Sequence, residues 1–396
     1  MEFTPIVPTD LNGTINNNHL KIAQEICKKS ATLKGSHNQY IINEIVSLLR
    51  KTNSYYSNRI ESEGTHPIDI DKAMRKEFSD DEKKRSLQKL SLAHIEVQKY
   101  IESNVNSHNS IYDKEFILDI HKQFYMQEGM DSFLDIQYGD LKATMMAGTF
   151  RDMDVTVGNH KAPSKEKVNS LLTHFDNMYN ISKQTSQEEQ LIYALCSHHR
   201  LVWIHPFLDG NGRVSRLFLD YLLFKIGLDG YGLWNISRGL ARDVDKYKQS
   251  LQYADMIVQG SQDGRGALSN RGLDSFLDFM LETALDQVEY MNKYLKIDSL
   301  GNNIEKYVKL SQNGLFDTEP LPKYSELVFK ELLIKGSISR GEVANIIGKS
   351  TRTATTLISK LIKADFLSSR SHKEPISLKF NSHFASYIIP ELMPQK

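Results

Sequence analysis

The chain has 396 residues, and its 49 Lys and Arg balance 49 Asp and Glu, which excludes a protein that binds nucleic acid or membrane through overall charge. Two cysteines, Cys27 and Cys196, are too few for a disulfide framework and wrongly spaced for a structural zinc site, which favours a reducing compartment. The sequence has no run of about 18 apolar residues and no N-terminal signal pattern, so we expect a cytoplasmic protein that does not enter a membrane.

The first hundred residues indicate helices. Residues 1–18 are rich in Pro, Asn and Thr and predict an extended arm on the surface. Residues 19–50 carry apolar side chains at helical spacing and predict two helices that are broken near Gly35. In the stretch 52–63, Ser57 and Glu61 fall one turn apart, on one face of a helix. Such a pair is common, and by itself it is typical of a solvated helix face.

The middle of the chain continues the helical pattern. Residues 80–104 and 117–124 predict two more helices, and residues 165–182 and 187–203 predict core helices, the second of which leads to His205. His198, His199 and His205 do not predict a metal centre. Adjacent histidines face different directions on a helix, and no cysteine or acidic ligand accompanies them.

Between these helices the pattern changes. From Gly148 to Gly158 the apolar residues Val155 and Val157 alternate with polar ones, which predicts a hairpin inside a helical protein. From the residues alone, a hairpin that covers the core and one that binds a partner segment by strand addition are equally compatible with this pattern.

The stretch His-Pro-Phe-Leu-Asp-Gly-Asn-Gly-Arg at 205–213 concentrates chemically useful side chains. Pro206 fixes its backbone angle and the glycines permit unusual ones, so a tight loop is expected. The apolar residues that follow recur at helical spacing, which places the loop at the start of a buried helix. The backbone N–H groups of Gly210, Asn211 and Gly212 would point out of that helix start, where the helix dipole favours an anion such as a di- or triphosphate.

The charged side chains of this stretch suit nucleotide chemistry. Asp209 is placed to hold Mg²⁺ against phosphate oxygens, and Arg213 and Arg216 can reach the phosphates from one face of the helix. His205 can accept a proton from a hydroxyl near neutral pH. The set suits attack by a deprotonated hydroxyl on a nucleotide phosphate, with pyrophosphate as the leaving group.

The C-terminal part differs in character. Residues 299–322 contain two glycines and two prolines and predict a connector, with some helix at 304–310. Residues 323–396 predict three helices followed by a strand pair, the order of a winged helix. From Leu321 onward twelve Lys or Arg stand against six Asp or Glu, so contact with DNA or with another protein is open at this stage.

The nine residues at 205–213 resemble the signature of the Fic family, HPFx[D/E]GN[G/K]R, at every position. The resemblance implies an all-α, mainly helical fold with a small hairpin flap, here followed by a winged helix. It divides the chain into an N-terminal helical region, a catalytic core, a connector and a C-terminal domain, at 1–110, 111–298, 299–322 and 323–396.

The resemblance implies transfer of AMP from ATP to a Tyr, Thr or Ser hydroxyl of a protein, the chain itself included. It assigns His205 as the base, Asp209 as the Mg²⁺ ligand, Gly210–Gly212 as the anion hole and Arg213 as the phosphate clamp. Lys at position 212 would mark the branch that phosphorylates its target, so Gly212 favours nucleotidyl transfer.

The resemblance also implies a form of control. Fic proteins commonly carry an inhibitory helix with the pattern [S/T]xxxE[G/N], whose Glu pairs with the second arginine of the active-site helix. At about 52–63, Ser57 and Glu61 match this pattern, and Arg216 is the expected partner. Ser62 stands where Gly or Asn is usual, which puts the end of that helix in doubt.

Two further regions are assigned by resemblance. The flap edge that holds the target segment is expected at Met153, Asp154, Val155, Thr156 and Val157. The adenine is expected against Tyr247 and Asp255.

Other functions stay open at this point. Removal of AMP from a target, transfer of UMP or phosphocholine, and a winged-helix regulator whose Fic-like body senses nucleotide without turnover all fit the sequence. A homodimer is also compatible with it.

Overall fold

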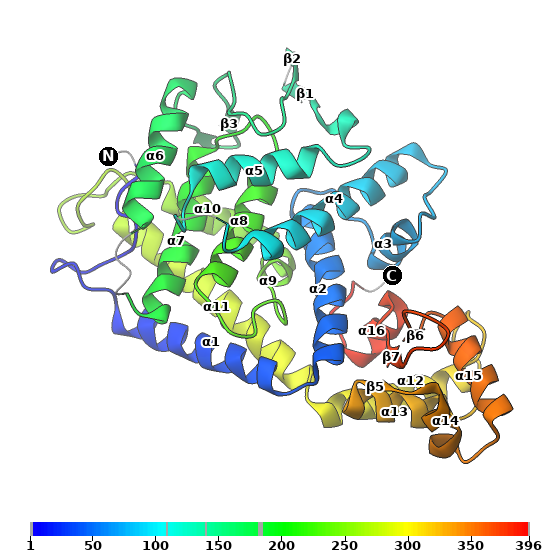
Figure 1. Cartoon of the computed structure of the whole chain (residues 1–396). Coiled ribbons are helices and arrows are strands. Elements are labelled where there is room, and N and C mark those ends of the chain that lie inside the picture. Colours follow the sequence, from blue (N-terminus) through cyan, green and yellow to red (C-terminus); the bar gives the residue numbers. More distant parts are fainter. Residues whose placement is uncertain (1–2, 108–109, 139–140, 181–184, 395–396) are drawn as a thin grey trace.

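The computed structural model describes residues 3–107, 110–138, 141–180 and 185–394 (Figure 1). Helices of the N-terminal region and of the centre are α1 (Asn17–Gly35), α2 (Gln39–Ile60), α3 (Pro67–Met74), α4 (Glu82–Asn104), α5 (Lys114–Tyr125), α6 (Val168–Tyr179), α7 (Gln187–Ile204) and α8 (Asn211–Lys225). Those that follow are α9 (Ser237–Arg242), α10 (Val244–Ala254), α11 (Asn270–Tyr294), α12 (Ile297–Gln312), α13 (Ser325–Lys335), α14 (Arg340–Ile347), α15 (Thr351–Lys363) and α16 (Ser382–Ile388).

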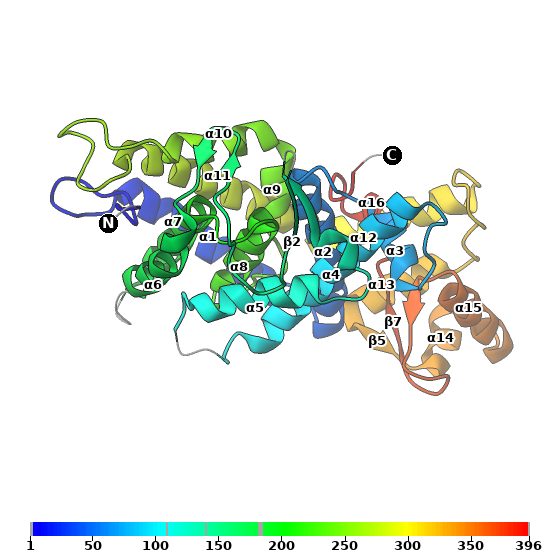
Figure 2. The same ribbon diagram turned by 90° about the horizontal axis from the view of Figure 1, so that it is seen from above.

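The strands are short and antiparallel. They are β1 (Asp135–Tyr138), β2 (Leu141–Thr144), β3 (Thr156–Val157), β4 (His160–Lys161), β5 (Ser337–Ile338), β6 (Leu367–Ser368) and β7 (Ile376–Leu378). Two hairpins, β1–β2 and β3–β4, lie at the same end of the molecule (Figures 1 and 2), and the C-terminal sheet has the order β5-β7-β6. The prediction of a mainly helical fold with a small hairpin is confirmed.

Helix α8 lies at the centre of the helical body. It contacts α2, α4, α5 and α7, and its residues from Arg213 to Leu223 are buried on all sides. Burial on all sides makes α8 a core helix, although it carries buried polar residues such as Arg216 and Asp220. Its N-terminus therefore opens toward a site whose walls come from several parts of the chain.

The N-terminal arm is not confined to the surface. Phe3, Ile6 and Val7 are buried in the main core. The arm is held by its backbone, because Tyr179 donates its hydroxyl to the Ile6 carbonyl at 2.8 Å and Arg200 donates to the Pro5 carbonyl at 2.7 Å. The prediction of a surface arm was wrong because three apolar residues in a Pro-rich stretch carry no periodic signal.

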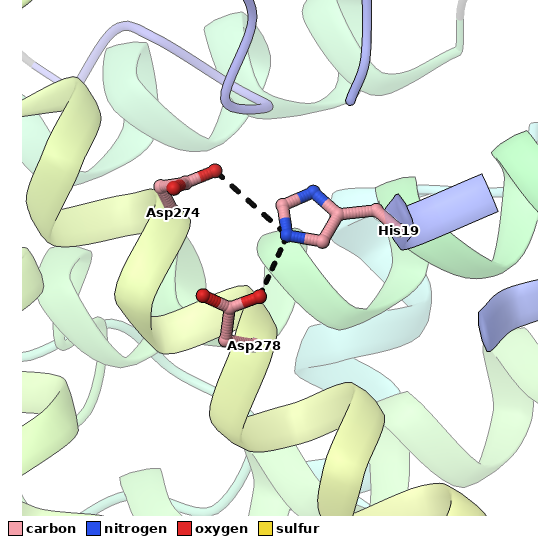
Figure 3. Close-up of side chains that lie close together, drawn as sticks. All are labelled: His19, Asp274 and Asp278. Carbon is pink, nitrogen blue, oxygen red and sulfur yellow. Dashed lines mark hydrogen bonds and ion pairs between the residues drawn. The ribbon is translucent and has the colours of Figure 1, made fainter. Parts of the chain in front are cut away.

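Helices α1 and α11 pack along each other and share several polar contacts, one of which is drawn in Figure 3. His19 of α1 is buried, and its Nε2 lies 2.8 Å from Asp278 Oδ1 and 3.8 Å from Asp274 Oδ1, both on α11. In the described part of the chain this is the one group of three His, Cys, Asp or Glu side chains close enough to share a cation. We interpret it as a polar contact that joins the two helices, since the direct hydrogen bond to Asp278 already satisfies Nε2.

The C-terminal part is joined to the body through α2 (Figures 1 and 2). The predicted connector is largely helix, because α12 spans Ile297–Gln312. Lys51 of α2 donates to Asp71 at 2.7 Å, and Asp71 accepts from the Ser382 backbone at 2.8 Å, so α2, α3 and α16 meet at one buried ion pair. No helix in the described residues is both long and apolar enough to cross a membrane.

Candidate active site

The loop at 205–213 begins where α7 ends. His205 is the C-cap of α7 and adopts a left-handed conformation, with φ 51° and ψ 63°, and Pro206 follows it. Its ring lines a pocket together with Trp203, Gly212 and Tyr247. Burial, together with the neighbouring His160 and Arg151, lowers the pKa of His205 to about 4. The imidazole is therefore neutral at physiological pH, the form that accepts a proton.

Helix α8 begins in the way the loop predicted. Gly210 is its N-cap at φ 81°, and a side chain at this position would meet the Tyr125 hydroxyl at 2.6 Å. Asn211 holds the turn from inside, because its Oδ1 accepts from the Phe207 N–H at 2.9 Å and its Nδ2 donates to the Phe207 carbonyl at 2.8 Å. The anion contact predicted for Asn211 is made by its backbone N–H, which the side-chain bonds leave available, and it stays a prediction.

Arg213 and Asp209 lie side by side at this helix start. Arg213 Nη2 donates to Asp209 Oδ2 at 3.0 Å and to the Tyr125 hydroxyl at 3.2 Å, and Tyr125 donates to the same Asp209 oxygen at 3.0 Å. Asp209 Oδ1 has no hydrogen-bond partner among the described residues, and the side chain is 45% exposed. A carboxylate oriented in this way, with one oxygen open to solvent, fits the ligand role predicted for it.

Arg216 is held by the end of α2. Its Nε donates to Ser57 Oγ at 2.9 Å, and its Nη2 donates to the Ser57 carbonyl at 2.9 Å and to Glu61 Oε1 at 2.7 Å. The pairing predicted for Glu61 and Arg216 is present. Burial favours the neutral form of the Glu61 carboxyl, but the charges of Arg216 and Arg213 outweigh burial and lower its pKa.

The Glu61 carboxylate lies where the loop would receive an anion. A Cβ added to Gly212 would come within 2.2 Å of Glu61 Oε1, so the carboxylate rests directly against the start of α8. A negative charge is favoured at this position, since the positive end of the helix dipole and two guanidinium groups converge there. The same features would attract nucleotide phosphates.

The end of α2 explains the departure at Ser62. The segment expected as a separate helix at 52–63 is the last part of α2, which ends at Ile60 with Glu61 as its C-cap. Ser62 then adopts φ 64°, the left-handed region that Gly and Asn adopt most easily. Ser62 therefore adopts the backbone conformation that Gly or Asn favours, and the end of α2 still directs Glu61 toward Arg216.

Sequence reasoning missed a second carboxylate. Glu63 accepts a hydrogen bond from Arg213 Nη1, so each arginine of the site has its own glutamate from one short segment. The Glu63 backbone N–H is fixed at 2.9 Å from the Asn58 carbonyl. The two glutamates of Glu-Ser-Glu at 61–63 could have indicated a second acidic contact, but in sequence they resemble any charged helix end. Tyr125 carried no signal at all.

The two residues assigned to adenine both line the pocket, and each contacts a histidine of α7. Tyr247 lines the pocket, and its hydroxyl lies 2.7 Å from His198 Nε2. Asp255 is engaged with two histidines, because its Oδ1 lies 3.0 Å from His199 Nε2 and its Oδ2 lies 3.3 Å from His160 Nδ1. The structure therefore places Asp255 as a link between α7 and the hairpin at the rim of the pocket. His198 and His199 thus have separate partners, and no shared centre forms.

The hairpin lies over this pocket but is shorter than expected. Of the predicted edge, only Thr156 and Val157 are in a strand, β3, which pairs with β4. Met153, Asp154 and Val155 precede it. Both β3 residues are exposed, and Val157 and the tip at Gly158–Asn159 line the same pocket as His205.

Comparison with known proteins identifies the central segment. Residues 111–223 match the model of the Fic/DOC family. A protein named Protein adenylyltransferase Fic from Aedes aegypti is 35% identical over 129 residues, which cover 33% of this chain and 23% of that protein. The protein of the same name from Drosophila grimshawi is 41% identical over 80 residues, 20% of this chain and 16% of that one. The matched segments thus span less than a quarter of these relatives.

Solved structures share the fold over more of the chain. A Fic family protein from Desulfovibrio desulfuricans G20 is similar with a TM-score of 0.51 and 16% identity, over 94% of this chain and 98% of that one. A Fic domain containing signaling protein from Bacteroides thetaiotaomicron has a TM-score of 0.53 and 16% identity, over 69% of this chain and 96% of that one. The turn at His205 and the start of α8 both lie within the matched residues, and the chain contains a Fic/DOC domain at 111–223.

Proposed function

We propose that this protein transfers AMP from ATP to a Tyr, Thr or Ser hydroxyl of a protein, its own chain included. One observation carries the proposal. The neutral imidazole of His205, the guanidinium group of Arg216 and the start of a buried helix at Gly212 line one pocket, and Arg213 and Asp209, which has one open oxygen, lie side by side at the same helix start. The relatives named adenylyltransferases are similar in part of this chain.

In the proposed reaction, His205 takes the proton of the target hydroxyl, and the oxygen attacks the α-phosphorus of ATP. The new O–P bond forms as the bond to the bridging oxygen of pyrophosphate breaks, and pyrophosphate leaves with the added negative charge. Arg213, Arg216 and the N–H groups of Gly210 and Gly212 stabilise that charge. Asp209 would hold Mg²⁺, which when bound neutralises the phosphate oxygens.

The flap is proposed to present the target. Strand addition to a short exposed hairpin supplies backbone hydrogen bonds that do not depend on the target's sequence. The exposure of Thr156 and Val157 next to the His205 pocket supports this role.

An experiment with labelled ATP distinguishes transfer of AMP from transfer of a phosphoryl group. ATP labelled at the α-phosphate should label protein in the presence of Mg²⁺, whereas ATP labelled at the γ-phosphate should not. Label from the γ-phosphate would indicate phosphorylation, and label from neither would contradict nucleotidyl transfer.

We further propose that the segment after α2 inhibits this site with two carboxylates. Glu61 holds Arg216 and Glu63 holds Arg213, so ATP must displace both before its phosphates reach the arginines. Once Glu61 is replaced by Gly, Glu63→Gln should tighten ATP binding by about fivefold, the size expected for one partly exposed ion pair of about 1 kcal/mol. Isothermal titration calorimetry measures the Kd.

A matched control is available. Glu102 is a half-exposed carboxylate paired with Arg50 away from the site, so Glu102→Gln should leave the Kd for ATP unchanged. An unchanged Kd in Glu63→Gln would show that Glu63 does not compete with phosphate.

A second activity, binding of duplex DNA, is favoured by the surface of α15. This helix follows α13 and α14 and precedes the strand pair β6–β7, which is the order of a winged helix. Its exposed side chains include no acid and are Thr351, Arg352, Thr353, Thr355, Thr356, Ser359, Lys360 and Lys363. A helix face of this composition suits phosphate and groove contact.

The full chain should therefore bind a duplex in a salt-dependent manner. In the double variant Lys360→Ala/Lys363→Ala, the slope of log K against log salt should fall in magnitude by about two, because each phosphate contact contributes about 0.9. Lys83→Ala/Lys84→Ala, an exposed lysine pair on α4, is the control. Equal slopes in all three proteins would instead favour a protein-contact role.

A further inference from the structure

Arg151 is a buried arginine whose hydrogen bonds all go to backbone carbonyls. Its side chain is completely buried. Nε donates to the His205 carbonyl at 2.8 Å, Nη1 donates to the Met153 carbonyl at 2.9 Å, and Nη2 donates to the Pro163 carbonyl. The nearest carboxylate, on Asp154, is 3.7 Å away and largely exposed. A guanidinium without a close ion pair in such a place is costly, so its position indicates a specific task.

The carbonyls belong to two parts of the site. Met153 lies three residues before β3, and Pro163 lies two residues after β4, so these carbonyls bracket the flap hairpin. The His205 carbonyl belongs to the turn at 205–210 between α7 and α8, which we call the catalytic turn. The Arg151 backbone adds a fourth contact, because its N–H donates to the Pro206 carbonyl at 2.9 Å. One residue therefore connects both ends of the flap to the turn that carries the proposed base.

The catalytic turn needs such support. His205 adopts φ 51°, and a left-handed conformation is unfavourable for a residue with a side chain. Arg151 contacts the carbonyls of His205 and of the next residue, which fixes the peptide planes on both sides of Pro206. The planar fork of arginine can meet several acceptors at once, whereas the single ammonium of lysine cannot.

The far end of the flap has its own support. His160 of β4 lies 2.9 Å from the Trp203 carbonyl through Nε2, and its Nδ1 lies 3.3 Å from Asp255. Lys165 joins the two sides of the flap base, since its Nζ donates to the Asp152 carbonyl at 2.8 Å. These contacts hold the hairpin near α7 and α10, but of these three residues Arg151 is the one that bonds to the catalytic turn itself.

We propose that Arg151 is a positioning residue that fixes the distance between the flap strand β3 and His205. It would thereby set the distance between the target hydroxyl and the imidazole that accepts its proton. The inference rests on the proposed function. A target strand on β3 takes its position from the flap, and the base takes its position from the turn. Transfer requires both in register, and a misplacement of about 1 Å can lower a rate by roughly 100-fold.

The test uses Arg151→Lys in the full-length Glu61→Gly protein, with ATP labelled at the α-phosphate and the chain itself as acceptor. Lysine keeps the charge but can meet only part of the carbonyl set. We expect kcat to fall roughly 100-fold, whereas KM for ATP stays within about twofold because Arg151 contacts no phosphate-binding group. Arg238→Lys is the control, since Arg238 is also buried and donates to the Glu391 carbonyl at 3.1 Å, outside the site. It should leave kcat unchanged.

A second readout does not depend on activity. Hydrogen exchange followed by mass spectrometry should show faster exchange in both 153–163 and 205–207 in Arg151→Lys, and in neither segment in Arg238→Lys. Unchanged kcat in a parent that labels, or unchanged exchange in the two segments, would overturn the inference. If the Glu61→Gly protein incorporates no label, the proposed transfer of AMP to the chain itself is wrong. The exchange result then still decides whether Arg151 couples the flap to the turn at His205.

Discussion

Replacement of Glu61 by glycine should increase AMP transfer about 10- to 100-fold over the natural sequence. The change removes a charged hydrogen bond to Arg216 and clears the carboxylate from Gly212. A hydrogen bond to a charged group contributes about 1.5–3 kcal/mol, which corresponds to this range when ATP no longer competes with it. Glu61 is the C-cap of α2, so glycine is compatible with the backbone there. Initial rates of protein labelling from ATP labelled at the α-phosphate measure the effect.

The control is a glutamate that also pairs with an arginine but lies away from the site. Glu77 pairs with Arg75 on the surface, and Glu77→Gly should leave the rate unchanged. A Glu61→Gly protein that labels no faster than the natural sequence would show that the contact with Arg216 does not limit transfer.

Replacement of His205 by alanine in the Glu61→Gly protein should lower the rate of transfer about 10²- to 10⁴-fold, the usual contribution of a general base. The residual rate would come from phosphate binding by Arg213, Arg216 and the start of α8, which the substitution leaves in place. The affinity for ATP should change little, because no phosphate contact is assigned to the imidazole. Labelling rates and a calorimetric Kd for ATP separate the two quantities.

His174→Ala is the matched control. His174 lies on α6 beside Phe3, with ring centroids 5.0 Å apart, and its loss should affect stability more than rate. Unchanged labelling in His205→Ala would mean that another group accepts the proton.

Much of the site could be predicted because its chemistry is local in sequence. The loop at 205–213 carries its own turn residues, and the start of α8 follows from Gly210 and from the apolar run after Arg213. The pairing of Glu61 with Arg216 came from a resemblance, and the contact is present. Its inhibitory effect stays a prediction.

The residues that were missed act through tertiary contacts. Glu63, Tyr125 and Arg151 reach the loop from segments far apart in the chain, and no spacing rule links them to it. Asp255 was assigned to the nucleotide by resemblance, and that role stays a prediction. Its partners, His160 and His199, become visible only when α7, α10 and the hairpin are assembled.

The fold shows the same division. Long helices, such as α4 and α7, were predicted to within a few residues. Short elements were not: α3, α16 and the β1–β2 hairpin were absent from the prediction. Elements of this length contain too few residues to establish a period.

The most direct measurement is a crystal structure of Glu61→Gly/His205→Ala with ATP and Mg²⁺. We expect the phosphates at the start of α8, against the backbone of Gly210 and Gly212, with Arg213 turned from Glu63 to the phosphates and Asp209 on the metal. Nucleotide bound elsewhere, or phosphates placed away from Arg213 with that side chain still on Glu63, would contradict it.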